Sequence, residues 1–155
     1  MVGKRDKILA WLSAQEPDAV FEIDFKREKR SLNANSYFHV LCQKIAEVTH
    51  QSLSEVKNQM IAEYGQIDME LGTVSIRDSI DWRSFDSLHV RPTNQVQMLD
   101  NGEYHRIYMV MRGSHTYDAR EMNILINGVV REAESVGVPT MTEKEISKLI
   151  ERWKP

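Results

Sequence analysis

The feature that most constrains the fold is a change of hydrophobic period within the first fifty residues. Apolar side chains nearly alternate over residues 19–26, at Val20, Phe21, Ile23 and Phe25. Over residues 33–49 they recur at helical spacing instead, at Tyr37, Phe38, Leu41, Ile45 and Val48. Alternation is typical of a half-buried strand, and spacing of three and four is typical of an amphipathic helix. The sequence therefore predicts a strand at 19–26 and a helix from about 33 to 49, with Ser31 or Asn33 as its N-cap.

A basic stretch lies between these two predicted elements. Residues 26–30 read Lys-Arg-Glu-Lys-Arg, and the polar run Ser31-Leu32-Asn33-Ala34-Asn35 follows. Guanidinium, ammonium and amide groups all donate hydrogen bonds to anions, as does the N-terminus of a helix. The stretch therefore predicts a surface that binds phosphates, of which a nucleic-acid backbone is the obvious source.

Further periodic segments and caps predict the rest of the fold. Apolar residues at 8, 9, 11 and 12 indicate a short helix over about 3–14, which ends near Pro17. Capping boxes open helices at Ser52 and Thr142, and a long helix begins at Asp118. Expected strands lie at 73–76, 88–91 and about 103–112, with a turn at 100–102 before the last of them. The order predicts an α+β fold in which about five helices pack with a small, mostly antiparallel sheet, in a single domain over 1–155.

Composition restricts the classes of function. The formal net charge is −3, so any binding of nucleic acid has to use local basic patches. The single cysteine, Cys42, excludes an intramolecular disulfide and a cysteine-rich zinc site, and it fits a reducing cytoplasm. No apolar run reaches membrane-spanning length. We expect a soluble protein of the cytoplasm, without a membrane partner.

No pattern in the sequence predicts catalysis or a cofactor. The five histidines form no metal-binding pair or cluster, and no glycine-rich phosphate loop is present. Cys42 lies among apolar residues and is interpreted as a small buried side chain rather than a nucleophile. Asp78 and Asp81 could together hold Mg²⁺ for phosphodiester cleavage, although loop aspartates are the more common interpretation. We therefore expect no metal site, no cofactor and no enzymatic activity.

Two further places could contact nucleic acid. Arg112 and His115 lie in a second basic segment, Arg112-Gly113-Ser114-His115, before the long helix. Trp153 stands between two cations near the C-terminus, where an aromatic ring can stack on an unpaired base. The same ring could instead close the core next to Leu149, and the sequence leaves both interpretations open.

The order of these parts resembles the phage recombination-mediator family Orf, also called NinB. In that family a helix and a strand lead into a basic Arg-Ser-Leu-x-x-Asn motif that opens a helix, and here the motif is Arg30-Ser31-Leu32-Asn33-Ala34-Asn35. The C-terminal half of the family has a long amphipathic helix, a Gly-Val or Gly-Ile step and a last helix that ends in an aromatic residue. Those parts correspond here to residues 117–122, 135–139 and 151–153. Residues 66–101 have no convincing counterpart.

The resemblance implies a non-enzymatic accessory of phage DNA recombination. Such proteins form homodimers, bind single-stranded DNA and act with single-strand-binding protein to load a recombinase. The expected DNA-binding residues are Arg27, Lys29, Arg30, Asn33, Asn35, Arg112, His115 and Trp153. The alternatives are a metal-dependent structure-specific nuclease that uses Asp78, Asp81 and His115, and a protein-interaction module that binds no nucleic acid.

Overall fold

The computed structural model describes residues 10–16 and 33–153. Residues 10–13 are helical, within the predicted first helix. The predicted strand at 19–26 and the basic residues Arg27, Lys29 and Arg30 lie outside the described part of the chain. The described residues from 33 onward belong to one compact unit, and that unit confirms the predicted α+β class.

Local capping explains where the first two helices of this unit begin. Helix α2, Ala34–Thr49, starts after Asn33, whose side chain accepts a hydrogen bond from the Ser36 amide at 2.8 Å. Helix α3, Leu53–Tyr64, starts with the predicted capping box between Ser52 and Glu55. Each side chain satisfies an amide that the first helical turn leaves without a backbone partner. Of the two predicted N-caps for α2, Asn33 is the one the structure uses.

Three antiparallel strands form the sheet, in the order β1-β3-β2. Strand β1 spans Thr73–Arg77, β2 spans His89–Met98 and β3 spans Tyr104–Met111. The predicted turn before β3 is present, and Gly102 takes a φ of 82° in it, where glycine has no steric penalty. Strand β2 continues seven residues beyond its predicted end at 91, after a register shift between Pro92 and Val96. Residues 93–97 are polar except for Val96 and lack the alternation that predicts a strand, and this part of β2 is a strand only because it lies along β3.

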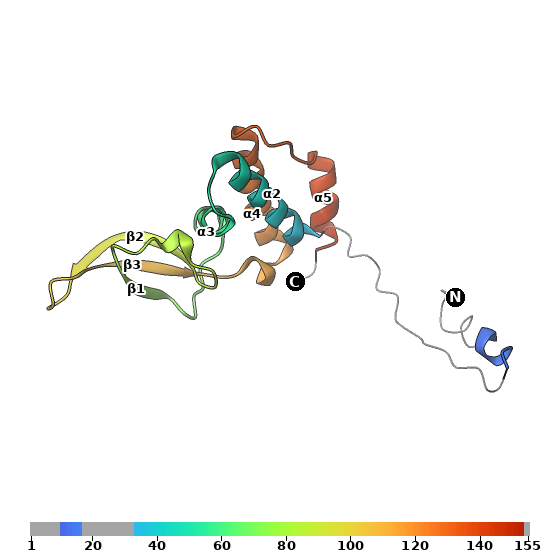
Figure 1. The fold of residues 1–155 in the computed structure, drawn as a ribbon, viewed down its shortest axis with the longest axis horizontal. Coiled ribbons are helices and arrows are strands. Elements are labelled where there is room, and N and C mark those ends of the chain that lie inside the picture. The colour runs from blue at the N-terminus through green and yellow to red at the C-terminus, as the bar shows by residue number, and fades with distance from the viewer. Residues whose placement is uncertain (1–9, 17–32, 154–155) are drawn as a thin grey trace. The chain divides into compact units, whose positions relative to one another are not determined.

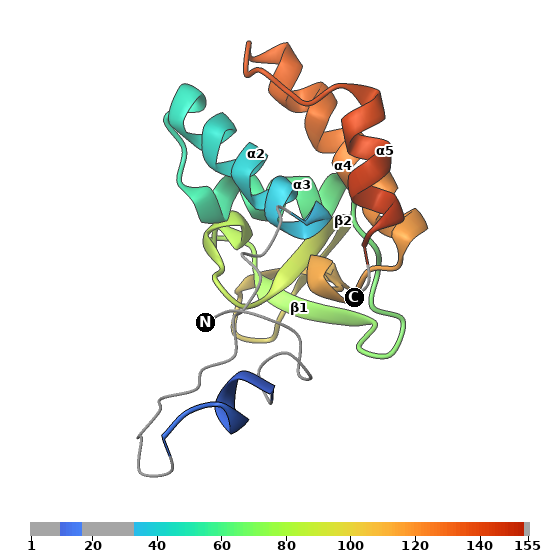
Figure 2. The ribbon, with the colours of Figure 1, turned by 90° about the vertical axis from the view of Figure 1, so that its right-hand side faces the viewer.

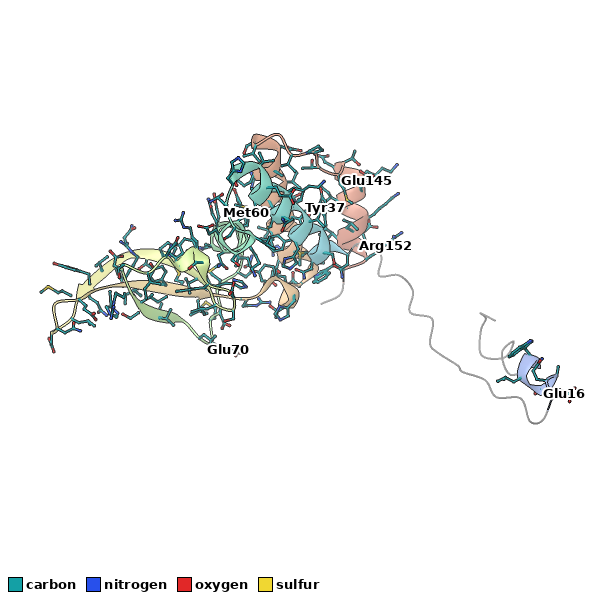
Figure 3. The ribbon with its side chains drawn as sticks, in the orientation of Figure 1. Glu16, Tyr37, Met60, Glu70, Glu145 and Arg152 are labelled. Carbon is teal, nitrogen blue, oxygen red and sulfur yellow. The ribbon has the colours of Figure 1, made fainter. Side chains whose placement is uncertain are left out.

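The C-terminal helices close the core. Helix α4, Ala119–Ser135, and helix α5, Glu143–Glu151, both begin with capping boxes. Their apolar faces and those of α2 and α3 share one buried cluster. Tyr37 lies inside this cluster, and its hydroxyl accepts a hydrogen bond from the Met141 amide at 2.7 Å (Figure 3). That contact joins the loop before α5 to the middle of the helical layer.

Within this unit the sheet extends away from the helices, as Figure 1 shows. Helix α3 contacts both β2 and the single 3-10 turn η1, which spans Trp82–Ser84. It therefore joins the sheet to the other helices. Helices α2, α4 and α5 pack against one another on the other side of α3 (Figure 2). A second turn, η2, Ser114–Thr116, connects β3 to α4. None of the described helices is long and apolar enough to cross a bilayer.

Candidate nucleic-acid interface

A pocket of about 360 Å³ opens where α2, α3, the start of β2 and the end of β3 meet η2. Its apolar wall includes Ile61, Leu88, Val110 and Met111. Its polar lining consists of Asn35, His39, Lys57, Ser87, His89, Ser114 and His115. None of the described residues that line it is acidic. A cavity with an apolar wall, several donors and no carboxylate suits an anionic ligand with an apolar body.

Two of the DNA-binding residues that the sequence predicts, Asn35 and His115, line this pocket. Asn35 lies in the first turn of α2, and its Oδ1 accepts a hydrogen bond of 2.7 Å from the hydroxyl of Ser114. Ser114 is buried and precedes His115, whose side chain is exposed at η2. The hydrogen bond therefore ties the start of α2 to the second predicted basic segment. Asn35 and His115 line one pocket although eighty residues of sequence separate them.

A hydrogen bond to the buried side chain of Asn58 fixes the orientation of the His89 ring. The amide nitrogen of Asn58, which is only 1% exposed, donates to the carbonyl oxygens of Arg83 and Phe85 at 2.7 and 2.6 Å. Its oxygen is therefore an acceptor, and it lies 2.6 Å from Nδ1 of His89. Nδ1 must carry the proton of this bond, so in the neutral ring Nε2 is the unprotonated acceptor.

Lys57 is the main cation at the pocket. Its side chain is half-buried on α3, and no described carboxylate forms an ion pair with it. Burial and the charge of Lys57 lower the pKa of His39 and lower the pKa of His89 to about 4, with smaller contributions to His89 from His115 and His39. His89 is therefore neutral at pH 7, and its ring places an acceptor nitrogen of known identity in the same pocket as a lysine.

Asn33 and Arg112 have structural partners in the protein itself. Asn33 is exposed and serves as the N-cap of α2. The guanidinium of Arg112 pairs with Glu121 at 2.9 Å, donates to the carbonyl of Thr116 at 2.7 Å and lies over the ring of Tyr117. These bonds take up several of its five donors. Arg112 thus holds the link between β3 and α4 together.

Trp153 packs against the buried helical cluster. Its indole Nε1 donates to the carbonyl oxygen of Tyr117 at 2.7 Å, which joins the end of α5 to the residue after η2. Of the two interpretations that the sequence left open, this geometry supports the one in which the ring closes the core. Arg152, next to it, is exposed (Figure 3).

The residues of the nuclease alternative lie in two different places. Asp78 pairs with Arg106 at 2.8 Å, and Asp81 pairs with Arg83 at 3.0 Å while capping η1. Both carboxylates line a shallow pocket beside the sheet, which His115 does not line. Across residues 10–16 and 33–153, no three His, Cys, Asp or Glu side chains are arranged to hold a metal ion. Cys42 is fully buried, as predicted, and burial raises the pKa of its thiol to about 12.

Three titratable residues of the pocket, His39, Lys57 and His89, are not among the site residues that the sequence predicts. The spacing of the histidines predicts no metal site and gives His39 and His89 no other role, and no motif distinguishes Lys57 from other lysines. One signal was available: Asn35 and His39 are four residues apart, so they share one face of the helix that the basic motif opens. Nothing local indicates that Lys57 and His89 join them, because that depends on how α3 and β2 pack.

Comparisons of the chain with protein-family models, with curated proteins and with solved structures find no match.

Proposed function

We propose that this protein is an accessory of phage DNA recombination that binds single-stranded DNA and helps to load a recombinase together with single-strand-binding protein. The observation that carries the proposal is the acid-free pocket with Lys57 and three histidines, beside the helix that follows the Arg-Ser-Leu motif. Because the chain has a net charge of −3, a strand has to bind where cations are locally in excess, and this pocket has a lysine and no carboxylate.

The basic motif strengthens this proposal. Arg30 comes three residues before Asn33, which caps α2, and Asn35 in the first turn of that helix lines the pocket. Cations next to a helix start and a lysine within a pocket together favour a ligand with repeating phosphates over a single small anion. The homodimer that the family resemblance implies is part of the proposal.

The arginine partners of Asp78 and Asp81 favour a binding protein over the nuclease alternative. A carboxylate that already pairs with a guanidinium gives up that charge-assisted bond before it can bind Mg²⁺. The two aspartates also lie apart from the cationic pocket, so a strand bound there is not directed at them.

The test is a titration of labelled single-stranded, duplex and branched DNA, followed by fluorescence anisotropy, with Lys57→Gln as the main variant. Lys57→Gln should weaken binding of single strands about threefold to tenfold and reduce the slope of log affinity against log salt by about one. Lys44→Gln is the matched control, because Lys44 is exposed on α2 and does not line the pocket. Equal affinities for wild type, Lys57→Gln and Lys44→Gln would remove the pocket from the binding surface.

A second variant addresses the basic motif. Replacing Lys29 and Arg30 together by Ala should lower affinity for all sequences alike and reduce the salt slope by about one to two. Each titration is repeated with Mg²⁺ and with Mn²⁺, and the strand is then run on a denaturing gel. Intact DNA agrees with a mediator, whereas shortened strands would support the nuclease alternative.

A further inference from the structure

The pocket contains two different kinds of hydrogen-bonding group, and a bare phosphate uses only one of them. Lys57 is a donor that suits phosphate oxygens. His89 is neutral and presents Nε2 as an acceptor, because Asn58 holds the proton on Nδ1. A phosphodiester has no N–H or O–H to donate. An acceptor of fixed orientation in this position calls for a ligand that carries N–H groups.

An unpaired nucleobase meets that requirement. Each of the four DNA bases has an N–H donor on its Watson–Crick edge, and in a duplex that donor is already paired. The apolar wall of Ile61, Leu88, Val110 and Met111 suits the faces of a flat ring. The pocket volume of about 360 Å³ lies in the range of sites that enclose small organic groups. His39 and His115 add imidazole rings on which a base can stack.

Resting on the proposed function, we infer that this pocket seats one unpaired base of a single strand, whose Watson–Crick N–H donates to Nε2 of His89 while an adjoining phosphate binds Lys57. The protein then distinguishes single strands from duplex by the Watson–Crick N–H donor, which is free only in unpaired bases. Since every base has such a donor, the pocket is not selective for sequence.

The deciding probes are two single strands of equal length, one of thymidylates and one of abasic nucleotides, which carry the same phosphates. Wild-type protein should bind the thymidylate strand at least about fivefold more tightly than the abasic strand, since each seated base contributes to affinity. Lys57→Gln should weaken binding of both strands alike, because both have the phosphate.

His89→Phe keeps an aromatic ring but has no acceptor. It should lower affinity for the thymidylate strand about two- to tenfold and leave the abasic strand unaffected, as expected for one neutral hydrogen bond. His105→Phe is the matched control, since His105 lies in β3, faces Ser75 and does not line the pocket. The control should retain the full preference for the thymidylate strand.

Because His89→Phe also leaves the buried side-chain oxygen of Asn58 without its partner, Leu88→Ala is the second variant. Leu88 is 36% exposed, so its truncation should leave the fold intact, as circular dichroism can verify, while it removes part of the apolar wall. It too should reduce the preference for bases. Equal binding of both strands by wild type, or full preference in both Leu88→Ala and His89→Phe, would overturn the inference. Binding of neither strand would instead contradict the proposed function.

Discussion

At the scale of single residues, the buried amide of Asn58 controls the chemistry of the pocket without lining it. Its two donations to backbone carbonyls orient its oxygen, and that oxygen sets the tautomer of His89. The buried side chain of Asn58 thus determines which nitrogen of the partly buried His89 ring is the acceptor. Protonation of His89 is costly, first because the ring is partly buried and then because of the charge of Lys57.

This cost predicts a dependence of stability on pH. The pKa of His89 is about 4 in the folded protein and near 6.5 when it is unperturbed. Between these values the unfolded chain binds more protons, so the free energy of unfolding should fall as pH drops from 6.5 towards 4. Urea titrations across this interval should show a shallower fall for His89→Phe than for wild type. His105→Phe serves as the control, and an identical pH dependence in all three would contradict the assignment.

The side chain of Asn33 has one structural role and one proposed role, and two substitutions separate them. Asn33→Ala removes the cap of α2 and should lower the free energy of unfolding by about 1 kcal/mol. Asn33→Asp keeps a capping oxygen but replaces the amide donor by a charge that repels phosphates. It should therefore melt like wild type and bind single strands more weakly. Wild-type affinity of Asn33→Asp would leave Asn33 with its capping role alone.

At the scale of elements, the close approach of α3 and α4 depends on a residue without a side chain. Gly128 is buried in the middle of α4, where a Cβ would overlap the ring of Tyr64 at the end of α3. Gly128→Ala should lower the free energy of unfolding by about 1–3 kcal/mol, because overpacking outweighs the gain in helix propensity. Asn127→Ala, at the exposed neighbouring position, is the control. Urea unfolding of both variants gives the comparison, and a stabilised Gly128→Ala would show that the two helices can separate.

Trp153 anchors the end of α5 to the core. One variant can therefore distinguish core packing of this ring from stacking on a DNA base. Trp153→Ala should destabilise the protein by about 3 kcal/mol, since it removes core packing and the hydrogen bond to Tyr117. Arg152→Ala, its exposed neighbour, should melt like wild type. Thermal melting and titration with single-stranded DNA are measured on the same samples. Normal melting of Trp153→Ala together with a five- to hundredfold loss of binding would support base stacking instead.

At the scale of the whole molecule, we predict a homodimer. Large apolar side chains are exposed on strands β2 and β3, among them Val96, Met98 and Tyr104, and closed twofold assembly is the commonest way to bury such surface. Sedimentation equilibrium at micromolar concentration should give twice the mass of one chain. A second run in high salt controls for association by charge alone. The mass of a single chain in both runs would exclude the dimer.

Local patterns were sufficient for most elements of the fold. The caps at Asn33, Ser52, Asp118 and Thr142 each satisfy backbone amides within a few residues, so the sequence identifies where those helices begin. The glycine turn before β3 is equally local. The sequence does not predict the part of β2 beyond residue 91, because these mostly polar residues form a strand only where they lie along β3.

What the sequence by itself determined is therefore the succession of helices and strands, the α+β class and the burial of Cys42. Each of these follows from hydrophobic period, capping or residue type. Only the tertiary structure decided that Asn35, Lys57, His89 and His115 line one pocket, that Asp78 faces Arg106, and that Trp153 packs on the core. These contacts join residues from different elements, and their formation depends on how the helices and the sheet pack, which no local pattern encodes.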